Sequence, residues 1–568
     1  MNTVEILLFV LAVAGVIGLG IWKSSDQSDG RGDAASNYFL AGRGLSWYLV
    51  GFSLIAANIS TEQFVGMSGQ AANWLGMAIA SYEWLAAITL VVVAFVILPR
   101  FLKTGIYTAP EFLEYRYGTF SRTVMAVATL MILVGVPTAS VIYSGAKVIS
   151  GYYPDVFLLG SLVGSCWLIA ILAAGYVFVG GLKACAWTDL VWGAALIIGG
   201  AIVAYLAFEA LASADPAALV PTATLKTVTA DQLVDASAWE RFQILNGGTA
   251  AEGGKLHMVR PLDDTQIPWS ALIVGLWIPN LFYWGFNQYI IQRTLGSKSL
   301  AEGQKGIVFA AFLKLLVPFV VVIPGILAFN LYYEEMAQAS GGYDFDGAFP
   351  TLLRNLVKPH PWISWFVLAA IFGAIVSSLA SMLNSASTIA TMDIIYKLFP
   401  NIPDSKLPFF GRICVVVFVI IAAIIAPTLS HPGFGGIFTF IQEFQGFISS
   451  GVIAIFIFGM LVPRAPRFLG WSGIVLNATL YGLIKWFLGP IIVDSGLWFA
   501  DEISFLDRMA ICFVVVCIYC TVMTLWKPLP QPVVLPENKD MDLTSSPAAK
   551  YCGAAVVVAT IALYIIFW

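Results

Sequence analysis

Residues 56–64 read Ala-Ala-Asn-Ile-Ser-Thr-Glu-Gln-Phe, a polar stretch inside an apolar run that extends over about residues 48–69. Each polar side chain in such a run costs free energy unless it lines a cavity or finds a partner. Gly66 and Gly69 follow in the same run, and glycine weakens a helix interior. We therefore predict that the helix unwinds here and that its freed carbonyl groups face protein, water or an ion.

The chain around this stretch is strongly apolar. Of its 568 residues, 59% are hydrophobic and 11% are charged, against about 25% charged in a typical soluble chain. So few charges would leave large apolar patches in water, which soluble monomers rarely tolerate. The composition excludes a soluble enzyme and predicts an all-α polytopic membrane protein. The net charge of −4 gives no basic footprint for nucleic acid.

Fourteen apolar runs are long enough to be membrane helices. Most lysines and arginines outside the runs lie in loops that follow odd-numbered runs, so these loops are predicted to be cytoplasmic and both termini extracellular or periplasmic. The runs lie at about residues 4–22, 48–69, 76–100, 121–150, 154–180, 186–211, 269–295, 304–333, 361–396, 408–427, 432–462, 466–490, 505–526 and 551–568.

A second break is predicted near Pro279 and Gly285, because proline removes a backbone donor and glycine loosens the next turn. The two breaks open two groups of five runs, 48–211 and 269–462. Since five is odd, the second group starts on the opposite side of the membrane, and inverted repeats with matching broken helices are typical of secondary transporters that bind solute near the midplane. The remaining parts are predicted to be an N-terminal helix and cytoplasmic loop (1–47), an external loop (212–268) and three C-terminal helices (463–568).

Other polar residues within the runs leave alternatives open. Glu83 is either a ligand for a solute or a protonated structural donor, and Lys314 needs a water-filled cavity or a partner. Ser377 and Ser378 follow Ala374 by three and four residues, so they share a helix face with its carbonyl. Neutral oxygens clustered in this way suit a hard monovalent cation, but small residues equally serve close helix packing.

Several motifs together resemble the sodium:solute symporter family, and within it the bacterial sodium/galactose, or sodium/glucose-type, branch. The resemblance is strong from about residue 35 to 460 and looser up to Trp568, and motifs of this length and order are specific for the family. The motifs are Tyr38–Arg43, the stretch 56–64, Gly105–Phe112, Gly180–Leu182, Trp187–Asp189, Asn287–Arg293 and Ser377–Ser385.

The resemblance implies two sites that share the first broken helix. Asp189 would be an electrostatic relay on the sodium exit route rather than a ligand. Sodium would bind the carbonyls of Ala56, Ile59 and Ala374 and the hydroxyls of Ser377 and Ser378. Sugar would bind Gln63, Glu83, Asn280, Tyr283, Trp284, Lys314 and Gln442. The gates would be Met67, Tyr82 and Phe438 on the outer side and Tyr283 on the inner side.

The function that this resemblance implies is sodium-coupled import of a monosaccharide of the galactose or glucose type by alternating access. Such a protein is not an enzyme. Its partners would be the sugar, the co-transported sodium ion and the lipid bilayer of the bacterial inner membrane, which it spans many times, without an obligatory protein partner. Amide groups, one acid, one base and an aromatic face suit a neutral polyol.

Departures from the family pattern leave the substrate open. Ala86 stands where the galactose branch has a serine, Leu133 and Pro137 replace a tyrosine and an asparagine, and one residue is added within 70–74. Because Lys314 could bind a carboxylate, a sodium symporter for a sialic acid, another organic acid or an amino acid is the alternative. A channel or a sugar sensor is the competing class, which would show a continuous polar face or an appended signalling domain.

Overall fold

The structure, a computed structural model, describes residues 3–25, 34–338, 341–431, 437–539 and 541–568. Within these ranges the chain is helical and forms no β-sheet. Eleven of the described helices are long and apolar enough to cross a membrane. Three shorter apolar helices lie at further predicted spans: Trp47–Asn58, Leu162–Gly175 and Ala271–Gly285. The all-helical membrane fold is confirmed, while the count of fourteen spans and the outside position of both termini stay predictions.

The helices follow one another along the chain in four groups. The N-terminal elements are α1 (Thr3–Ser25) and α2 (Ala34–Leu40). Next come α3 (Trp47–Asn58), the π-helical turn η2 (Glu62–Met67), α4 (Ser68–Ala72), η3 (Gly76–Ala80), α5 (Ser81–Val92), η4 (Val93–Ile97), α6 (Leu98–Thr104), α7 (Ala109–Tyr117), α8 (Thr119–Leu133), η5 (Val134–Thr138), α9 (Ala139–Tyr152) and α10 (Leu162–Ser213).

After the polar loop with α11 (Pro216–Leu219), α12 (Asp231–Val234) and α13 (Ala238–Asn246), the second set begins. It contains η8 (Ala271–Gly275), α14 (Trp277–Gly285), α15 (Gln288–Leu295), α16 (Leu300–Met336), α17 (Ala348–Leu352), α18 (Pro361–Ile389), η11 (Ala390–Ile395), α19 (Tyr396–Leu398), α20 (Leu407–Ile425) and α21 (Ile437–Leu461). The last group is α22 (Leu469–Leu483), η15 (Ile484–Leu488), α23 (Gly489–Asp494), α24 (Phe505–Trp526) and α25 (Pro547–Ile566). The predicted start of the eleventh run, 432–436, lies outside the described residues.

Both predicted helix breaks are present. Helix α3 ends at Asn58, and Ile59 adopts an extended conformation (φ −82°, ψ 106°) before the chain winds again at Glu62. The second break separates α14 from α15, where the carbonyl of Phe282 accepts hydrogen bonds from the amides of Phe286 and Asn287 at 3.0 and 2.9 Å. Polar and small residues release backbone groups at these two points, and the surrounding protein satisfies them.

Helix α10 differs from the sequence-based expectation of two separate spans, 154–180 and 186–211. It begins at Leu162, where the Ser161 hydroxyl accepts a hydrogen bond from the Gly164 amide at 3.3 Å, and its helical backbone continues to Ser213. The glycine pair at 180–181 weakens a helix by about 1 kcal/mol per residue, but each glycine keeps its N–H and so does not end the helix as a proline would.

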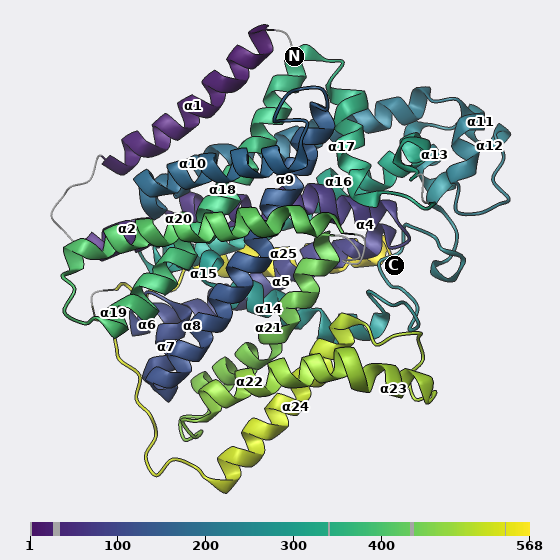
Figure 1. The fold of residues 1–568 in the computed structure, drawn as a ribbon. Coiled ribbons are helices and arrows are strands. Elements are labelled where there is room, and N and C mark those ends of the chain that lie inside the picture. The colour runs from purple at the N-terminus through teal and green to yellow at the C-terminus, as the bar shows by residue number, and fades with distance from the viewer. Residues whose placement is uncertain (1–2, 26–33, 339–340, 432–436, 540) are drawn as a thin grey trace.

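The elements that carry polar residues meet in the middle of the fold. Helix α3 packs against α10 and α16, and α5 packs against α14 and α16. Helix α21 packs against both α14 and η2. In Figure 1, α5 and α14 lie centrally, while α22, α23 and α24 form the lower edge and α11, α12 and α13 lie at the right. The centre is therefore built from both predicted repeats, and the additional helices surround it.

The polar loop that contains α11 to α13 is attached to the end of the first broken helix through Lys255. The Lys255 ammonium donates to the carbonyl of Ala72 at 2.6 Å, and the amide of Met77 donates to the carbonyl of Lys255 at 2.7 Å. The ammonium also lies 4.0 Å from the ring centroid of Phe329. Burial lowers the pKa of Lys255 from 10.5 to about 7. Lys255 thus holds the loop against the first broken helix, although burial disfavours its charged form.

This burial predicts a pH dependence of stability. Between about pH 7 and 10 the unfolded chain holds a proton on Lys255 that the folded chain has lost, so the free energy of unfolding rises with pH in this window. We expect the melting temperature of the wild type to rise relative to that of Lys255→Met between pH 7 and pH 10 in detergent. Lys226→Met, which alters an exposed lysine of the same loop, is the matched control. Parallel curves for wild type and Lys255→Met would contradict the assignment.

Candidate functional site

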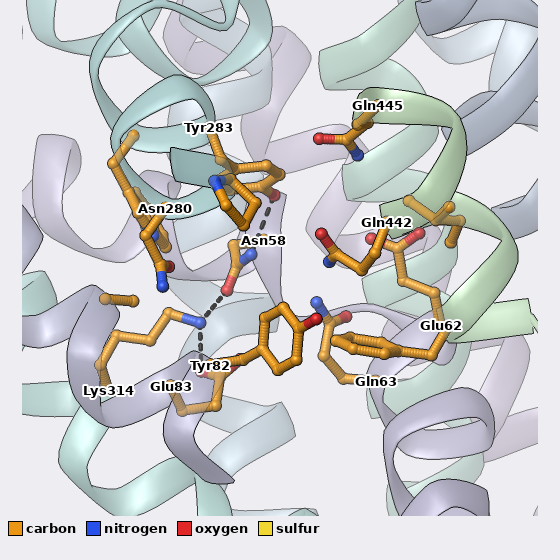
Figure 2. A pocket seen from close by; sticks show the side chains of 15 residues that line it. Asn58, Glu62, Gln63, Tyr82, Glu83, Asn280, Tyr283, Lys314, Gln442 and Gln445 are labelled. Carbon is orange, nitrogen blue, oxygen red and sulfur yellow. Dashed lines mark hydrogen bonds and ion pairs between the residues drawn. The ribbon is translucent and has the colours of Figure 1, made fainter. Parts of the chain in front are cut away.

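A pocket lies where the first broken helix faces α5, α14, α16 and α21 (Figure 2). Its lining is dominated by amides and paired charges, with aromatic rings at its ends. It is lined by Asn58, Glu62, Gln63, Tyr82, Glu83, Ala86, Pro279, Asn280, Tyr283, Trp284, Lys314, Phe438, Ile441, Gln442 and Gln445. All seven residues that the resemblance implies for sugar binding are therefore brought to one cavity.

The lysine and the glutamate of this pocket form an ion pair. The Lys314 ammonium contacts the carboxylate of Glu83 and the side-chain oxygen of Asn58. The amide nitrogen of Asn58 then donates to the Tyr283 hydroxyl at 2.9 Å. Lys314 is 1% exposed and its ammonium lies 5.1 Å from the ring centroid of Trp284. A chain of hydrogen bonds thus joins α16, α5, α3 and α14, as the dashed lines in Figure 2 show.

The remaining amides are held by backbone groups. The side-chain oxygen of Gln63 accepts a hydrogen bond from the Ser60 amide at 2.9 Å, so it caps the helix break and leaves its NH₂ group for a solute. The Asn280 NH₂ donates to the carbonyl of Leu276 at 3.0 Å, which leaves its oxygen available. Amides held in place with one free donor or acceptor are suited to form hydrogen bonds with the hydroxyl groups of a small polar molecule.

The pocket is closed in this structure. The rings of Tyr82 and Phe438 meet edge to face with centroids 4.9 Å apart, and Met67 is fully buried. On the other side, Tyr283 packs against Trp284 and Tyr289 with centroid distances of 5.1 and 5.5 Å. The free space between the lining side chains is about 40 Å³, which holds only a few water molecules. These side chains must move apart to admit a sugar-sized solute.

The two serines of α18 lie against the end of α3. The Ser378 hydroxyl donates to the carbonyls of Ala56 and Ala57 at 3.2 and 3.4 Å, and the Ser377 hydroxyl lies 3.4 Å from the carbonyl of Ala56. Ala374 precedes Ser378 by one turn, and Ile59 is the first residue after α3; both are 1% exposed. The structure therefore brings oxygens from the first break and from α18 together at one buried junction.

Asp189 is in direct contact with this junction. One carboxylate oxygen accepts from the Ser377 hydroxyl at 2.5 Å, and the other accepts from Ser53 at 2.5 Å and from Arg293 at 3.3 Å. Arg293 also donates to Ser53 and contacts Ser381, and it is fully buried. Arg293, at the end of the seventh predicted run, thus lies inside the fold in α15, where Asp189 and the serines satisfy its charge.

Sequence reasoning missed Asn58, Glu62 and Gln445 in the pocket, and Arg293 beside Asp189. Asn58 and Glu62 belong to the polar stretch 56–64, so their position next to the helix break was the available signal. Among the three family departures, Ala86 lines the pocket, whereas Leu133 and Pro137 are not among its lining residues. The loss of a hydroxyl at Ala86 therefore bears directly on the pocket.

Comparison with known proteins shows which family this chain resembles. The model of the sodium:solute symporter family matches residues 38–470. The sodium/glucose cotransporter of Vibrio parahaemolyticus is 40% identical over 84% of this chain and 84% of its own length. The sodium/myo-inositol cotransporter 2 of Mus musculus is 30% identical over 85% of this chain and 70% of its own length.

A solved structure shows the same fold. A Na⁺-coupled sialic acid symporter in a substrate-bound outward-open state superimposes with a TM-score of 0.72 at 20% identity, over 94% of this chain and all of that one. This likeness concerns the fold, whereas the family model and the relatives at 30–40% identity concern descent. On this evidence the chain belongs to the sodium:solute symporter family.

Proposed function

We propose that this protein imports a monosaccharide, a hexose of the galactose or glucose type, by sodium-coupled symport with alternating access. Membership of its family makes it a multi-pass membrane transporter with sodium as the co-transported ion. That the transported solute is a monosaccharide goes beyond family membership and is the part that we propose. It is supported by the pocket, where the Gln63 amide leaves its donor group free and the Asn280 amide leaves its acceptor free, and by the similarity to a sodium/glucose cotransporter.

The observation that carries this proposal is the pairing of Lys314. A transported carboxylate needs a cation that is free to receive it, but the Lys314 ammonium is already in contact with Glu83 and Asn58. Buried charges that are paired and hydrogen-bonded are costly to separate. The pocket therefore offers hydrogen bonds to a neutral polyol more readily than a counter-charge to a sialic acid or another organic acid.

Coupling would use the junction of the first break and α18. Sodium at the carbonyls of Ala56, Ile59 and Ala374 and the hydroxyls of Ser377 and Ser378 would hold the broken helix against α18, beside the sugar pocket. The Ser377 hydroxyl donates a hydrogen bond to Asp189, so its oxygen lone pairs are free for a cation. One charge moved down a potential of 100 mV supplies about 2.3 kcal/mol, enough for accumulation of tens-fold if one ion accompanies each sugar.

The proposal is tested by uptake into proteoliposomes. We expect radiolabelled galactose or glucose to accumulate when sodium is present outside, and to equilibrate slowly or not at all when choline replaces sodium. N-acetylneuraminate and amino acids serve as the competing substrates in the same assay. Hexose uptake that does not depend on sodium, or sodium-driven uptake of an acid without uptake of any hexose, would overturn the proposal.

Gln63→Ala tests the sugar site separately from the ion site. Removing the amide deletes one or two hydrogen bonds to the solute, each contributing about 1 kcal/mol, so we expect the KM for hexose to rise about five- to 30-fold while sodium still stabilises the protein against heat. Gln70→Ala is the matched control, because Gln70 lies about two helix turns further along and its amide contacts Thr439 at 3.3 Å, outside the pocket. An unchanged KM in Gln63→Ala would contradict the site.

A further inference from the structure

Trp84 lies beside the pocket without lining it. It follows Glu83 in α5, and its side chain is fully buried. The indole N–H donates to the carbonyl of Leu315 at 3.3 Å, and Leu315 follows Lys314 in α16. One hydrogen bond therefore joins the residues that come directly after the two members of the buried ion pair.

Helix α16 is weakened at the turn that carries Lys314. Pro318 lies four residues further along, inside the helix. Proline has no N–H, so the carbonyl of Lys314 loses its usual partner in the helix, and the proline ring crowds that carbonyl. The direction of the lysine side chain then depends on contacts from neighbouring helices, and the indole bond to Leu315 is such a contact at the same turn.

The rotation of α5 about its axis decides where Glu83 points. Successive residues of a helix differ by about 100° in direction, so Glu83 faces the pocket while Trp84 faces α16 and α25. A rotation of α5 that carries Glu83 away from Lys314 also pulls the indole away from the Leu315 carbonyl. Contacts that hold the indole therefore hold the carboxylate as well.

Helix α25 packs on the other side of the indole. The rings of Tyr564 and Phe567 lie with their centroids 6.0 and 5.8 Å from that of Trp84, and α25 packs along both α5 and α16 (Figure 1). The carbonyl of Phe567 accepts a hydrogen bond from the Met258 amide at 2.8 Å, which fixes this end of α25 to the polar loop. A helix outside the two predicted repeats thus holds a residue next to the pocket.

We propose that Trp84, held by α25, is a positioning residue of the transport site: its indole sets α5 and α16 so that Glu83 and Lys314 meet and together bind a hydroxyl group of the solute. This inference rests on the proposed function and deepens it, because it assigns one solute hydroxyl to the ion pair and gives α25 a part in its recognition. A paired carboxylate and ammonium can still bind a hydroxyl, since each forms more than one hydrogen bond.

The test uses the full-length protein in proteoliposomes, with monodeoxy analogues of the transported hexose as competitors. Trp84→Phe keeps an aromatic ring and removes the N–H. We expect the KM for hexose to rise about fivefold, as for the loss of one hydrogen bond, while the maximal rate and the sodium dependence stay within about twofold of the wild type. Trp277→Phe is the matched control, because the Trp277 indole donates at 3.0 Å to the carbonyl of Leu272, outside the pocket. It should change none of these values.

The deoxy analogues separate positioning from packing. An analogue that lacks the hydroxyl bound by the pair gains nothing from the position of the pair, so its inhibition constant should be the same in Trp84→Phe and in the wild type. The other analogues should bind about fivefold more weakly, as the hexose does. Glu83→Asp, which withdraws the carboxylate by one methylene group, identifies the same analogue independently. Phe567→Leu should reproduce the pattern of Trp84→Phe, whereas Trp568→Leu, at a residue that is 72% exposed, should not.

The outcomes separate the role of Trp84 from the proposed function. An equal loss for every analogue in Trp84→Phe, or an unchanged KM, would show that the role is wrong while the proposed function stands. A wild-type pattern in Phe567→Leu would remove α25 from the proposal. If Glu83→Asp singles out no analogue, both the role of Trp84 and the place of the ion pair in the sugar site fail. If the transported solute is another neutral polyol whose deoxy analogues show the pattern, only the hexose assignment fails. Because inhibition constants report only on folded transporters, a smaller folded fraction cannot produce the pattern.

Discussion

Lys314→Met is expected to reduce sodium-driven hexose uptake at least about 100-fold. The substitution leaves the Glu83 carboxylate buried without its cation and removes the donor to Asn58, which in turn holds the Tyr283 hydroxyl. Breaking a buried ion pair on one side typically costs about 3–5 kcal/mol, and each 1.4 kcal/mol is a factor of ten. Initial uptake rates at equal amounts of reconstituted protein measure the loss.

Two further variants separate recognition from folding. Lys485→Met removes a lysine that also lies within an apolar helix but pairs with Glu443 at 2.7 Å in a half-buried position, and it should retain most of the uptake. The double variant Lys314→Met with Glu83→Gln removes both charges of the buried pair. It should recover thermal stability without recovering hexose uptake. Uptake by Lys314→Met within tenfold of the wild type would show that the pair is not part of the sugar site.

Ser378→Ala is expected to raise the sodium concentration for half-maximal uptake by about ten- to 100-fold. The hydroxyl of Ser378 is the α18 atom that contacts both Ala56 and Ala57 at the end of α3. Loss of one oxygen that interacts with a charge corresponds to about 1.5–3 kcal/mol. Because the sugar pocket is not altered, uptake at saturating sodium should remain near that of the wild type.

Ser387→Ala is the matched control for this experiment. Ser387 lies on the same helix and is equally buried, but among the described residues its hydroxyl donates only to the carbonyl of Asn384 one turn earlier. It should leave the sodium dependence unchanged. An unaltered sodium dependence in Ser378→Ala would show that the ion binds elsewhere, and a loss of uptake at all sodium concentrations would indicate a structural role for this hydroxyl.

The site also changes how the role of Asp189 is understood. As an isolated acid on an exit route, Asp189 would attract sodium through space. In the structure it accepts a hydrogen bond from the Ser377 hydroxyl and is paired with Arg293. It therefore orients one of the proposed sodium ligands, while Arg293 balances its charge. The Asp189–Arg293 pair also links this junction to α15.

The amino-acid sequence by itself determined the membrane class and the two helix breaks. Both follow from local chemistry. A folded chain with so few charged side chains would expose large apolar patches to water. The stretch 56–64, and Pro279 together with Gly285, do not suit the interior of a regular helix. Some polar residues of the pocket, such as Glu83 and Lys314, were also visible in the sequence, because a polar side chain within an apolar run needs a cavity or a partner.

Only the tertiary structure decided which charges are paired. Glu83 and Lys314 are 231 positions apart in the chain, and Asp189 and Arg293 are 104 apart. The periodicity of a helix tells which residues share one of its faces, but it carries no information on which neighbouring helix that face meets. Packing therefore made Arg293 a buried partner of Asp189, and it left Glu62 without an ion pair among the described residues, because α16 presents Lys314 to Glu83 instead.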